Sequence, residues 1–163
     1  RTFQYSDALG FIAVLKNHYS KFNSLESAFV SGAEFISIKD SLTNFHTYFF
    51  NDETIIQSRT KKHISTPVKN SACKRLNMFL RWMVRQDNEG VDFGLWKKIP
   101  QSQLMIPLDV HVFNVSKKMN IIHAIKPDWN AVEELTSLLR RLDKNDPIRY
   151  DYALFCLGVE KLT

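Results

Sequence analysis

The sequence predicts an all-α fold, and three observations support that prediction. Apolar residues recur at spacings of three and four, as in Ile38, Leu42, Phe45 and Phe49, which places them on one face of a helix. Only five Gly and five Pro occur in 163 residues, too few for the many turns of a β-sandwich or barrel. Hydrophobic residues make up 44% of the chain, which is enough to bury the core of a single helical domain over 1–163.

The first half of the chain is expected to hold three helices. Ser6 is of a type that caps helices, here one that ends near Ser20. A short helix is expected over 24–30, and Ser37 precedes the third helix as its cap. Residues 51–70 are polar and basic, so they are expected to form a loop or a broken helix. The inward face of the first helix is expected to be Leu9, Ile12, Ala13 and Leu15.

The second half begins with the strongest helical pattern of the chain. It covers 71–85 and is followed over 87–103 by an excursion that Gly90 and Gly94 interrupt. Seven and eleven residues separate Lys74 from Arg81 and Arg85, a spacing that places all three on one stripe of this helix. The expected buried face is Leu76, Phe79, Leu80, Met83 and Val84.

Three acidic residues predict the starts of the remaining helices. Asp109 precedes a segment over 110–119 that reads as a helix, although its valines would also suit a short strand. Asp128 is the expected cap of the next helix. Asp146, followed by Pro147, is the expected cap of a last helix that ends near Leu157.

A basic strip lies in the middle of the chain. Between Arg59 and Gln86 there are eight Lys or Arg residues and no Asp or Glu, and the net charge of the whole chain is +5. Such a strip suits a polyanion, so we expect DNA as the partner. The residues expected to contact phosphates are Arg59, Lys61, Lys62, Lys69, Arg75, Arg81 and Arg85.

The composition also excludes several classes of protein. Two cysteines, Cys73 and Cys156, are too few for a disulfide framework, and no run of eighteen apolar residues predicts a membrane span. The five histidines form no cluster with ligand spacing, so we expect no metal and no cofactor. We expect a cytoplasmic protein. The chain starts at Arg1 without a methionine, and we expect its first helices to lie upstream.

Three segments resemble those of one enzyme superfamily. Ala72-Cys73-Lys74-Arg75-Leu76-Asn77 resembles the turn and second helix of a helix-hairpin-helix. Pro107-Leu108-Asp109-Val110-His111-Val112 resembles a Pro-containing loop that ends in a helix-capping Asp, and Ala153-Leu154-Phe155-Cys156-Leu157-Gly158 resembles the closing helix. The superfamily is that of the helix-hairpin-helix DNA glycosylases, typified by endonuclease III. The resemblance implies a hairpin-like helix, an insertion and an Asp-capped helix over 69–119.

A closer resemblance is to a bacterial family of unassigned function that is similar to these glycosylases. It covers the residues from Ser71 to Arg85 and Gly90-Val91-Asp92-Phe93-Gly94-Leu95-Trp96, and it extends to Asp146-Pro147 and Tyr150-Asp151. The chain departs from the glycosylase pattern in that Asn70 and Ala72 stand where the hairpin glycines are expected. Its long Lys-to-Asp spacing is more similar to that of archaeal 8-oxoguanine glycosylases. The cysteines of an iron–sulfur cluster are missing.

The resemblance implies that Lys74 is a nucleophile and that Asp109 is its catalytic carboxylate. A lysine amine can attack the sugar C1′ of a damaged nucleoside, and a facing carboxylate can stabilise a cationic sugar. The expected function is therefore removal of damaged bases from DNA, with an oxidised purine as the substrate class. Two alternatives stay open: a nucleic-acid-binding module without catalysis, and a helical protein-interaction domain. In both, Lys74 is a solvated cation and Asp109 only caps a helix.

Overall fold

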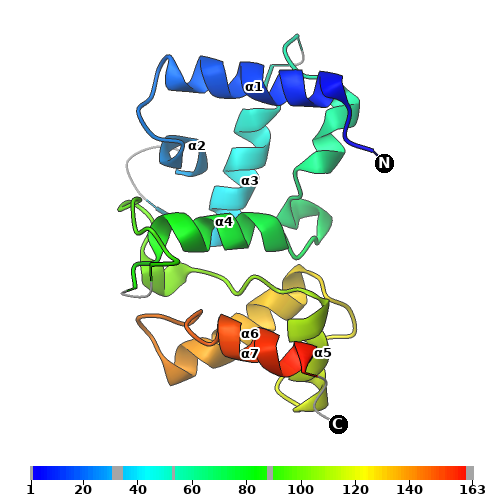
Figure 1. The fold of residues 1–163 in the computed structure, drawn as a ribbon, viewed down its shortest axis with the longest axis vertical. Helices are drawn as coiled ribbons and strands as arrows, with labels where there is room; N and C mark the ends of the chain where they lie inside the picture. Colours follow the sequence, from blue (N-terminus) through cyan, green and yellow to red (C-terminus); the bar gives the residue numbers. More distant parts are fainter. Residues whose placement is uncertain (1, 31–34, 53, 88–89, 161–163) are drawn as a thin grey trace. The chain divides into compact units, whose positions relative to one another are not determined.

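The fold is described from a computed structural model that covers residues 2–30, 35–52, 54–87 and 90–160 (Figure 1). Every regular element within these ranges is a helix, which confirms the all-α prediction. The chain divides into two compact units, Arg1–Thr66 and Pro67–Thr163. Units of this kind can belong to one domain, so the single domain stays a prediction. None of the helices in these ranges has the length and apolar character that a membrane crossing requires.

The first unit contains α1 (Tyr5–Tyr19), α2 (Glu26–Phe29), α3 (Ile38–Phe49) and the 3-10 helix η1 (Ser58–His63). Ser37 caps α3 as predicted, because its hydroxyl accepts a hydrogen bond from the Asp40 N–H at 3.1 Å. The short helix α2 packs against α3, with the ring of Phe29 stacked on that of Phe45 at 4.1 Å. The 3-10 helix agrees with the broken helix expected over 51–70.

The predicted cap and inward face of α1 were wrong. Gln4 is the N-cap, in a capping box with Asp7, and not Ser6. Leu9 and Ile12 are 47% and 61% exposed, whereas the buried residues of this helix are Asp7, Gly10, Val14 and His18. Two of these four are polar, and both are buried because distant parts of the unit supply hydrogen bonds to them. Periodicity of apolar residues alone selects the opposite face.

The carboxylate of Asp7 ties η1 to the start of α1. It accepts a hydrogen bond from the Thr60 hydroxyl at 2.6 Å, lies 3.3 Å from the Arg59 guanidinium and 3.4 Å from the His63 ring nitrogen. The side chain of Asp7 is fully buried. The hydrogen bond from Thr60 is the main reason that the pKa of Asp7 lies below its usual range, together with the Gln4 N–H and the nearby cations, against the opposing effect of burial.

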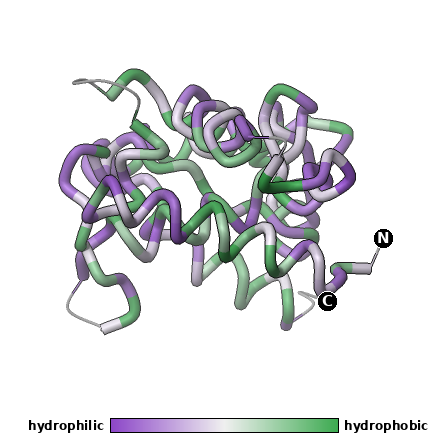
Figure 2. The backbone as a smooth tube through the Cα atoms, turned by 90° about the horizontal axis from the view of Figure 1, so that it is seen from above, coloured by the Kyte–Doolittle hydropathy of each residue, from purple (hydrophilic) through white to green (hydrophobic). Residues whose placement is uncertain are grey.

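The second unit contains η2 (Pro67–Lys69), α4 (Lys74–Val84), η3 (Gln101–Gln103), α5 (Val110–Lys118), α6 (Trp129–Leu142) and α7 (Asp151–Val159). Hydrophobic and hydrophilic residues alternate along the helices, as they do when one side of a helix is buried (Figure 2). Helix α5 packs against α7, and a Cβ on Gly158 would lie 2.6 Å from the His111 carbonyl oxygen. Only glycine permits this approach. The largest buried core residues include Trp129, Leu80, Leu104, Ile106, Leu108, Leu135 and Ile148.

Two of the three predicted caps in this unit are confirmed. Asp109 caps α5, which is a helix and not the alternative strand, and Asp128 accepts a hydrogen bond from the Ala131 N–H at the start of α6. The cap predicted at Asp146 was wrong, since α7 begins at Asp151 with Tyr150 as its N-cap. The carboxylate of Asp146 instead accepts hydrogen bonds from the guanidinium of Arg85. An ion pair therefore occupies the carboxylate that was expected to cap the helix.

The lowered pKa of Asp7 predicts a pH-dependent loss of stability on substitution by Asn. A lowered pKa stabilises the folded state above the unfolded pKa of about 3.9, and this contribution disappears as the pH falls through the folded value. Asp7→Asn should therefore lower the melting temperature most at pH 7, and the difference from the wild type should shrink towards pH 2. Thermal unfolding of both proteins across this range measures it. A difference that stays constant with pH would contradict the assigned role of the Asp7 charge.

Candidate active site and nucleic-acid interface

The turn before α4 sets the position of Lys74. Asn70 and Cys73 have φ angles of 53° and 49°, in the left-handed region that glycine adopts most easily. The Asn70 side-chain amide donates to the Asp128 carboxylate at 2.9 Å, and the Asn77 amide donates to the Ala72 carbonyl at 3.2 Å. Side-chain hydrogen bonds thus hold a turn made without glycine. Lys74 is the first residue of the helix that follows.

Lys74 and Asp109, which 35 positions separate in the sequence, lie together in the structure. The Lys74 Nζ is 3.6 Å from the Asp109 Oδ2. The other oxygen of the same carboxylate, Oδ1, accepts hydrogen bonds from the His111 and Val112 N–H groups at 2.9 Å each. One oxygen therefore caps α5 and the other faces the amine. The cap orients the carboxylate toward Lys74, so capping and ion pairing are compatible at this residue.

A pocket of about 310 Å³ opens beside this pair. Lys74 and Asp109 both line it, and most of the remaining lining is apolar. The apolar and aromatic side chains that matter for a flat ligand are Met78, Trp82, Tyr152 and Phe155. Pockets with a mostly apolar lining and a few charged groups are typical binding sites for small organic groups. The lysine side chain is 44% exposed and that of the aspartate 17%, so both can be reached from solvent.

Arg81 and Arg85 do not face outward as cations for phosphates. Their side chains are each 13% exposed, and both guanidinium groups bind the fully buried carboxylate of Asp92. Arg81 also binds Asp151 at 2.5 Å, and Arg85 binds Asp146 at 2.9 Å and Asp87. Although burial by itself lowers the pKa of Arg85, hydrogen bonds to Asp146 and Asp92 outweigh it and raise that pKa. Arg81 and Arg85 were predicted to contact phosphates, but their guanidinium groups instead bind carboxylates of the second unit.

Asp151 is a residue of this site that sequence reasoning missed. It is the first residue of α7, is 5% exposed and lines the same pocket as Lys74 and Asp109. Burial raises its pKa, and the ion pair with Arg81 opposes that change. An acidic residue at the start of an apolar helix was the available signal.

The other predicted cations are divided between the two units. Lys69 and Arg75 are exposed beside the turn and the first residue of α4 in the second unit. Arg59, Lys61 and Lys62 belong to η1 in the first unit. Arg59 also pairs with Asp7 and is 36% exposed. The cations nearest to Lys74 in the sequence that remain exposed are therefore Lys69 and Arg75.

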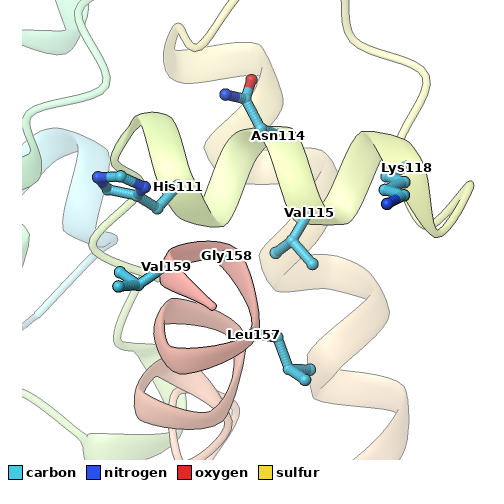
Figure 3. A pocket seen from close by; sticks show the side chains of 7 residues that line it. All are labelled: His111, Asn114, Val115, Lys118, Leu157, Gly158 and Val159. Atoms are coloured by element: carbon cyan, nitrogen blue, oxygen red, sulfur yellow. The ribbon is translucent and has the colours of Figure 1, made fainter. Parts of the chain in front are cut away.

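A second pocket, of about 390 Å³, lies where α5 meets α7 (Figure 3). Its polar residues, His111, Asn114 and Lys118, all come from α5, and Gly158 lies on the α7 side. The ring of His111 meets that of Phe155 edge to face at 5.9 Å, and Phe155 also lines the first pocket. Across the part of the chain that the structure describes, no three His, Cys, Asp or Glu side chains are grouped as metal ligands would be.

The buried ion pairs predict a large difference in stability between substitutions of Arg85, the C-cap of α4, and Arg75 within that helix. Arg85→Met keeps an aliphatic chain but leaves the buried Asp92 with fewer cationic partners, so the folded state should lose about 3–5 kcal/mol. Arg75→Met is the matched control, because Arg75 is exposed on the same helix and its loss should change stability by no more than about 0.5 kcal/mol. Urea unfolding measures both. Equal effects of the two substitutions would mean that the carboxylate cluster contributes nothing to stability.

A comparison with known proteins identifies the family of this chain but indicates no activity. Neither the curated proteins nor the solved structures that were searched contain a match to the chain. A family model with the description "Protein of unknown function (DUF2400)" matches residues 1–160, nearly the whole sequence. The chain therefore belongs to the DUF2400 family.

Proposed function

We propose that this chain binds DNA and removes damaged bases, with Lys74 as the nucleophile and Asp109 as its carboxylate partner. The observation that carries the proposal is the amine–carboxylate pair, 3.6 Å apart, at a largely apolar pocket of about 310 Å³. Nucleophile and charged partner must act on the same atom, and this arrangement gives both groups access to one bound nucleoside. The resemblance to helix-hairpin-helix glycosylases at the same two residues supports the same reaction.

In the proposed reaction Asp109 takes a proton from the Lys74 ammonium with which it pairs, and the resulting amine attacks C1′ of the damaged nucleoside. The glycosidic bond breaks, and the base leaves with the bonding electrons and takes up a proton. Asp109 then passes that proton to the leaving base, and the negative charge that it regains stabilises the positive charge that develops on the sugar. Opening of the sugar ring then gives a Schiff base between Lys74 and C1′, which borohydride reduces to a stable amine.

The pocket lining supports a flat aromatic substrate. Trp82, Tyr152 and Phe155 present rings around the pocket, and Met78 adds a polarisable side chain. An extruded base is flat and loses its stacking partners, so aromatic walls replace the contacts that it had in the duplex. We propose an oxidised purine as the substrate class. This choice rests on the long segment between Lys74 and Asp109, in which the chain is similar to archaeal 8-oxoguanine glycosylases.

One observation favours a nucleic-acid-binding module as the second candidate. Lys74 is 44% exposed and already pairs with a carboxylate, an arrangement that also suits a surface cation with no chemical role. The module would use Lys69, Lys74 and Arg75 for phosphate contacts and would leave DNA unchanged. Formation of a covalent complex and release of a base distinguish the two candidate functions, because DNA binding is common to both.

Binding itself predicts a change in salt dependence. Arg75→Met removes one exposed cation beside the site, so the slope of log affinity against log salt should become shallower by about one unit. Lys144→Met is the control and should keep the wild-type slope, since Lys144 is an exposed cation two residues before Asp146, which pairs with Arg85 at the end of α4 opposite Lys74. Fluorescence anisotropy with a duplex oligonucleotide at several salt concentrations measures both slopes. If Arg75→Met keeps the wild-type slope, Arg75 makes no phosphate contact.

The chemical step predicts different effects for two substitutions at the pair. Lys74→Gln should abolish the covalent complex that borohydride traps on DNA with an oxidised purine, because no amine remains there to form a Schiff base. Asp109→Asn should keep the cap of α5, since Asn also caps well, and should slow base release by about 10²-fold or more. Lys144→Gln is the control and should trap like the wild type. Gel analysis of trapped and released products measures all three.

The outcomes separate the candidates clearly. A wild-type protein that binds DNA but gives no trapped complex and no base release on a panel of lesions would favour the binding module. Trapping that persists in Lys74→Gln would remove this lysine as the nucleophile, even if bases are released. A folded Lys74→Gln protein with nearly unchanged affinity is expected, because the phosphate contacts are spread over several cations.

A further inference from the structure

The segment 91–96 carries an inverted pattern of side chains. In an extended segment successive residues point to opposite sides, and the apolar ones normally point inward. Here Asp92, Gly94 and Trp96 are buried, whereas Val91, Phe93 and Leu95 are 52%, 59% and 65% exposed. We call these three exposed residues the apolar ridge. Three large apolar side chains therefore face solvent from a segment that buries a carboxylate.

The inner side of this segment is anchored to α4 and fixes the ridge in place. The Phe93 N–H donates to the Trp82 carbonyl at 2.7 Å, and the Trp96 N–H donates to the Met83 carbonyl at 2.8 Å. The buried carboxylate of Asp92 binds two arginines of the same helix. At Gly94, with φ of 58°, a Cβ would come within 2.7 Å of the Gln86 side chain. These hydrogen bonds and ion pairs fix the backbone of the segment that carries the apolar ridge.

The ridge continues into the rim of the proposed catalytic pocket. Val91 lines that pocket together with Trp82, which is itself 41% exposed. Two exposed lysines, Lys97 and Lys98, follow directly after the anchored Trp96. Apolar side chains grouped on a surface commonly mark an interaction site. Rings and aliphatic chains beside cations suit a nucleic acid whose bases are unstacked, because such bases offer flat apolar faces next to phosphates.

We propose that the apolar ridge packs against unpaired nucleobases next to the nucleotide held in the pocket. The inference rests on the proposed function only in that the nucleic acid enters that pocket, and it does not need the chemistry at Lys74. The ridge gives the protein a preference for DNA that is locally unpaired, since in a fully paired duplex the base faces are covered by their neighbours. Contact through base faces is tolerant of sequence.

The test uses the double variant Phe93→Ser, Leu95→Ser, with Ile125→Ser as the control. All three side chains are exposed, Ile125 at 90%, so the substitutions remove surface contacts and not core packing. Affinity is measured for a duplex with a three-nucleotide unpaired gap and for the same duplex fully paired, using the Lys74→Gln background so that no reaction interferes. The double variant should lose about tenfold or more of its preference for the gapped duplex. The salt slope should not change, because no cation is removed.

Fluorescence of 2-aminopurine placed in the gap provides the second readout. Stacking quenches this base, so contact with Phe93 should lower its emission in the complex, and the double variant should restore the emission. The Ile125→Ser control should behave like the wild type in both measurements.

Several results would overturn the inference. The first two are that the protein binds neither duplex, or that the double variant keeps the wild-type preference for the gapped duplex. The other two are that the double variant loses equal affinity for both duplexes, or that Ile125→Ser loses as much of the preference as the double variant does. A change in oligomeric state by sedimentation, with the DNA preference unchanged, would instead identify the ridge as a contact between copies of the chain. Trapping by the wild-type protein reports separately on Lys74, so failure of the chemistry and failure of the ridge can be told apart.

Discussion

The carboxylate of Asp92 holds three separate segments of the second unit together. It binds Arg81 of α4 and Arg85, the C-cap of that helix. Arg81 also binds Asp151, the first residue of α7, and Arg85 also binds Asp146, which precedes α7. Buried charges are costly unless they are paired, so removing one member leaves the others unsatisfied. This network therefore sets the positions of α7 and of the irregular segment that follows α4. The candidate pocket lies between these segments and α5, so its shape depends on it as well.

The positions of Lys74 and Asp109 follow from ordinary helix chemistry on this framework. A left-handed residue, Cys73, precedes α4 and fixes the position of Lys74. The position of Asp109 is fixed because one of its carboxylate oxygens caps α5. Gly158 lets α7 approach α5 closely, which brings Phe155 and Tyr152 of α7 to the same pocket as the pair. These side chains thus have structural roles, and the proposed reaction uses side-chain atoms that are not engaged in those roles. The Oδ2 of Asp109, which faces Lys74, is the main example.

Features of the fold that depend on neighbours in the sequence could be predicted, and those that depend on distant partners could not. The caps at Ser37, Asp109 and Asp128 act within three residues, so the local sequence is sufficient. The buried face of α1 depends on Thr60, 53 residues from Asp7, and the role of Arg81 depends on Asp151, 70 residues away. A basic residue in a sequence has no visible partner. For that reason Arg81 and Arg85 were predicted to face phosphates, although they bind carboxylates.

We propose that the side-chain nitrogen of Lys74 forms a covalent bond to DNA, and mapping that bond tests the proposal most directly. The wild-type protein is mixed with an oligonucleotide that contains an oxidised purine, reduced with borohydride and digested with a protease, and the DNA-bearing peptide is identified by mass spectrometry. We expect a single adduct on the peptide that contains Lys74, with the added mass on that side chain. An adduct on another lysine, or DNA binding without any adduct across a panel of lesions, would contradict it.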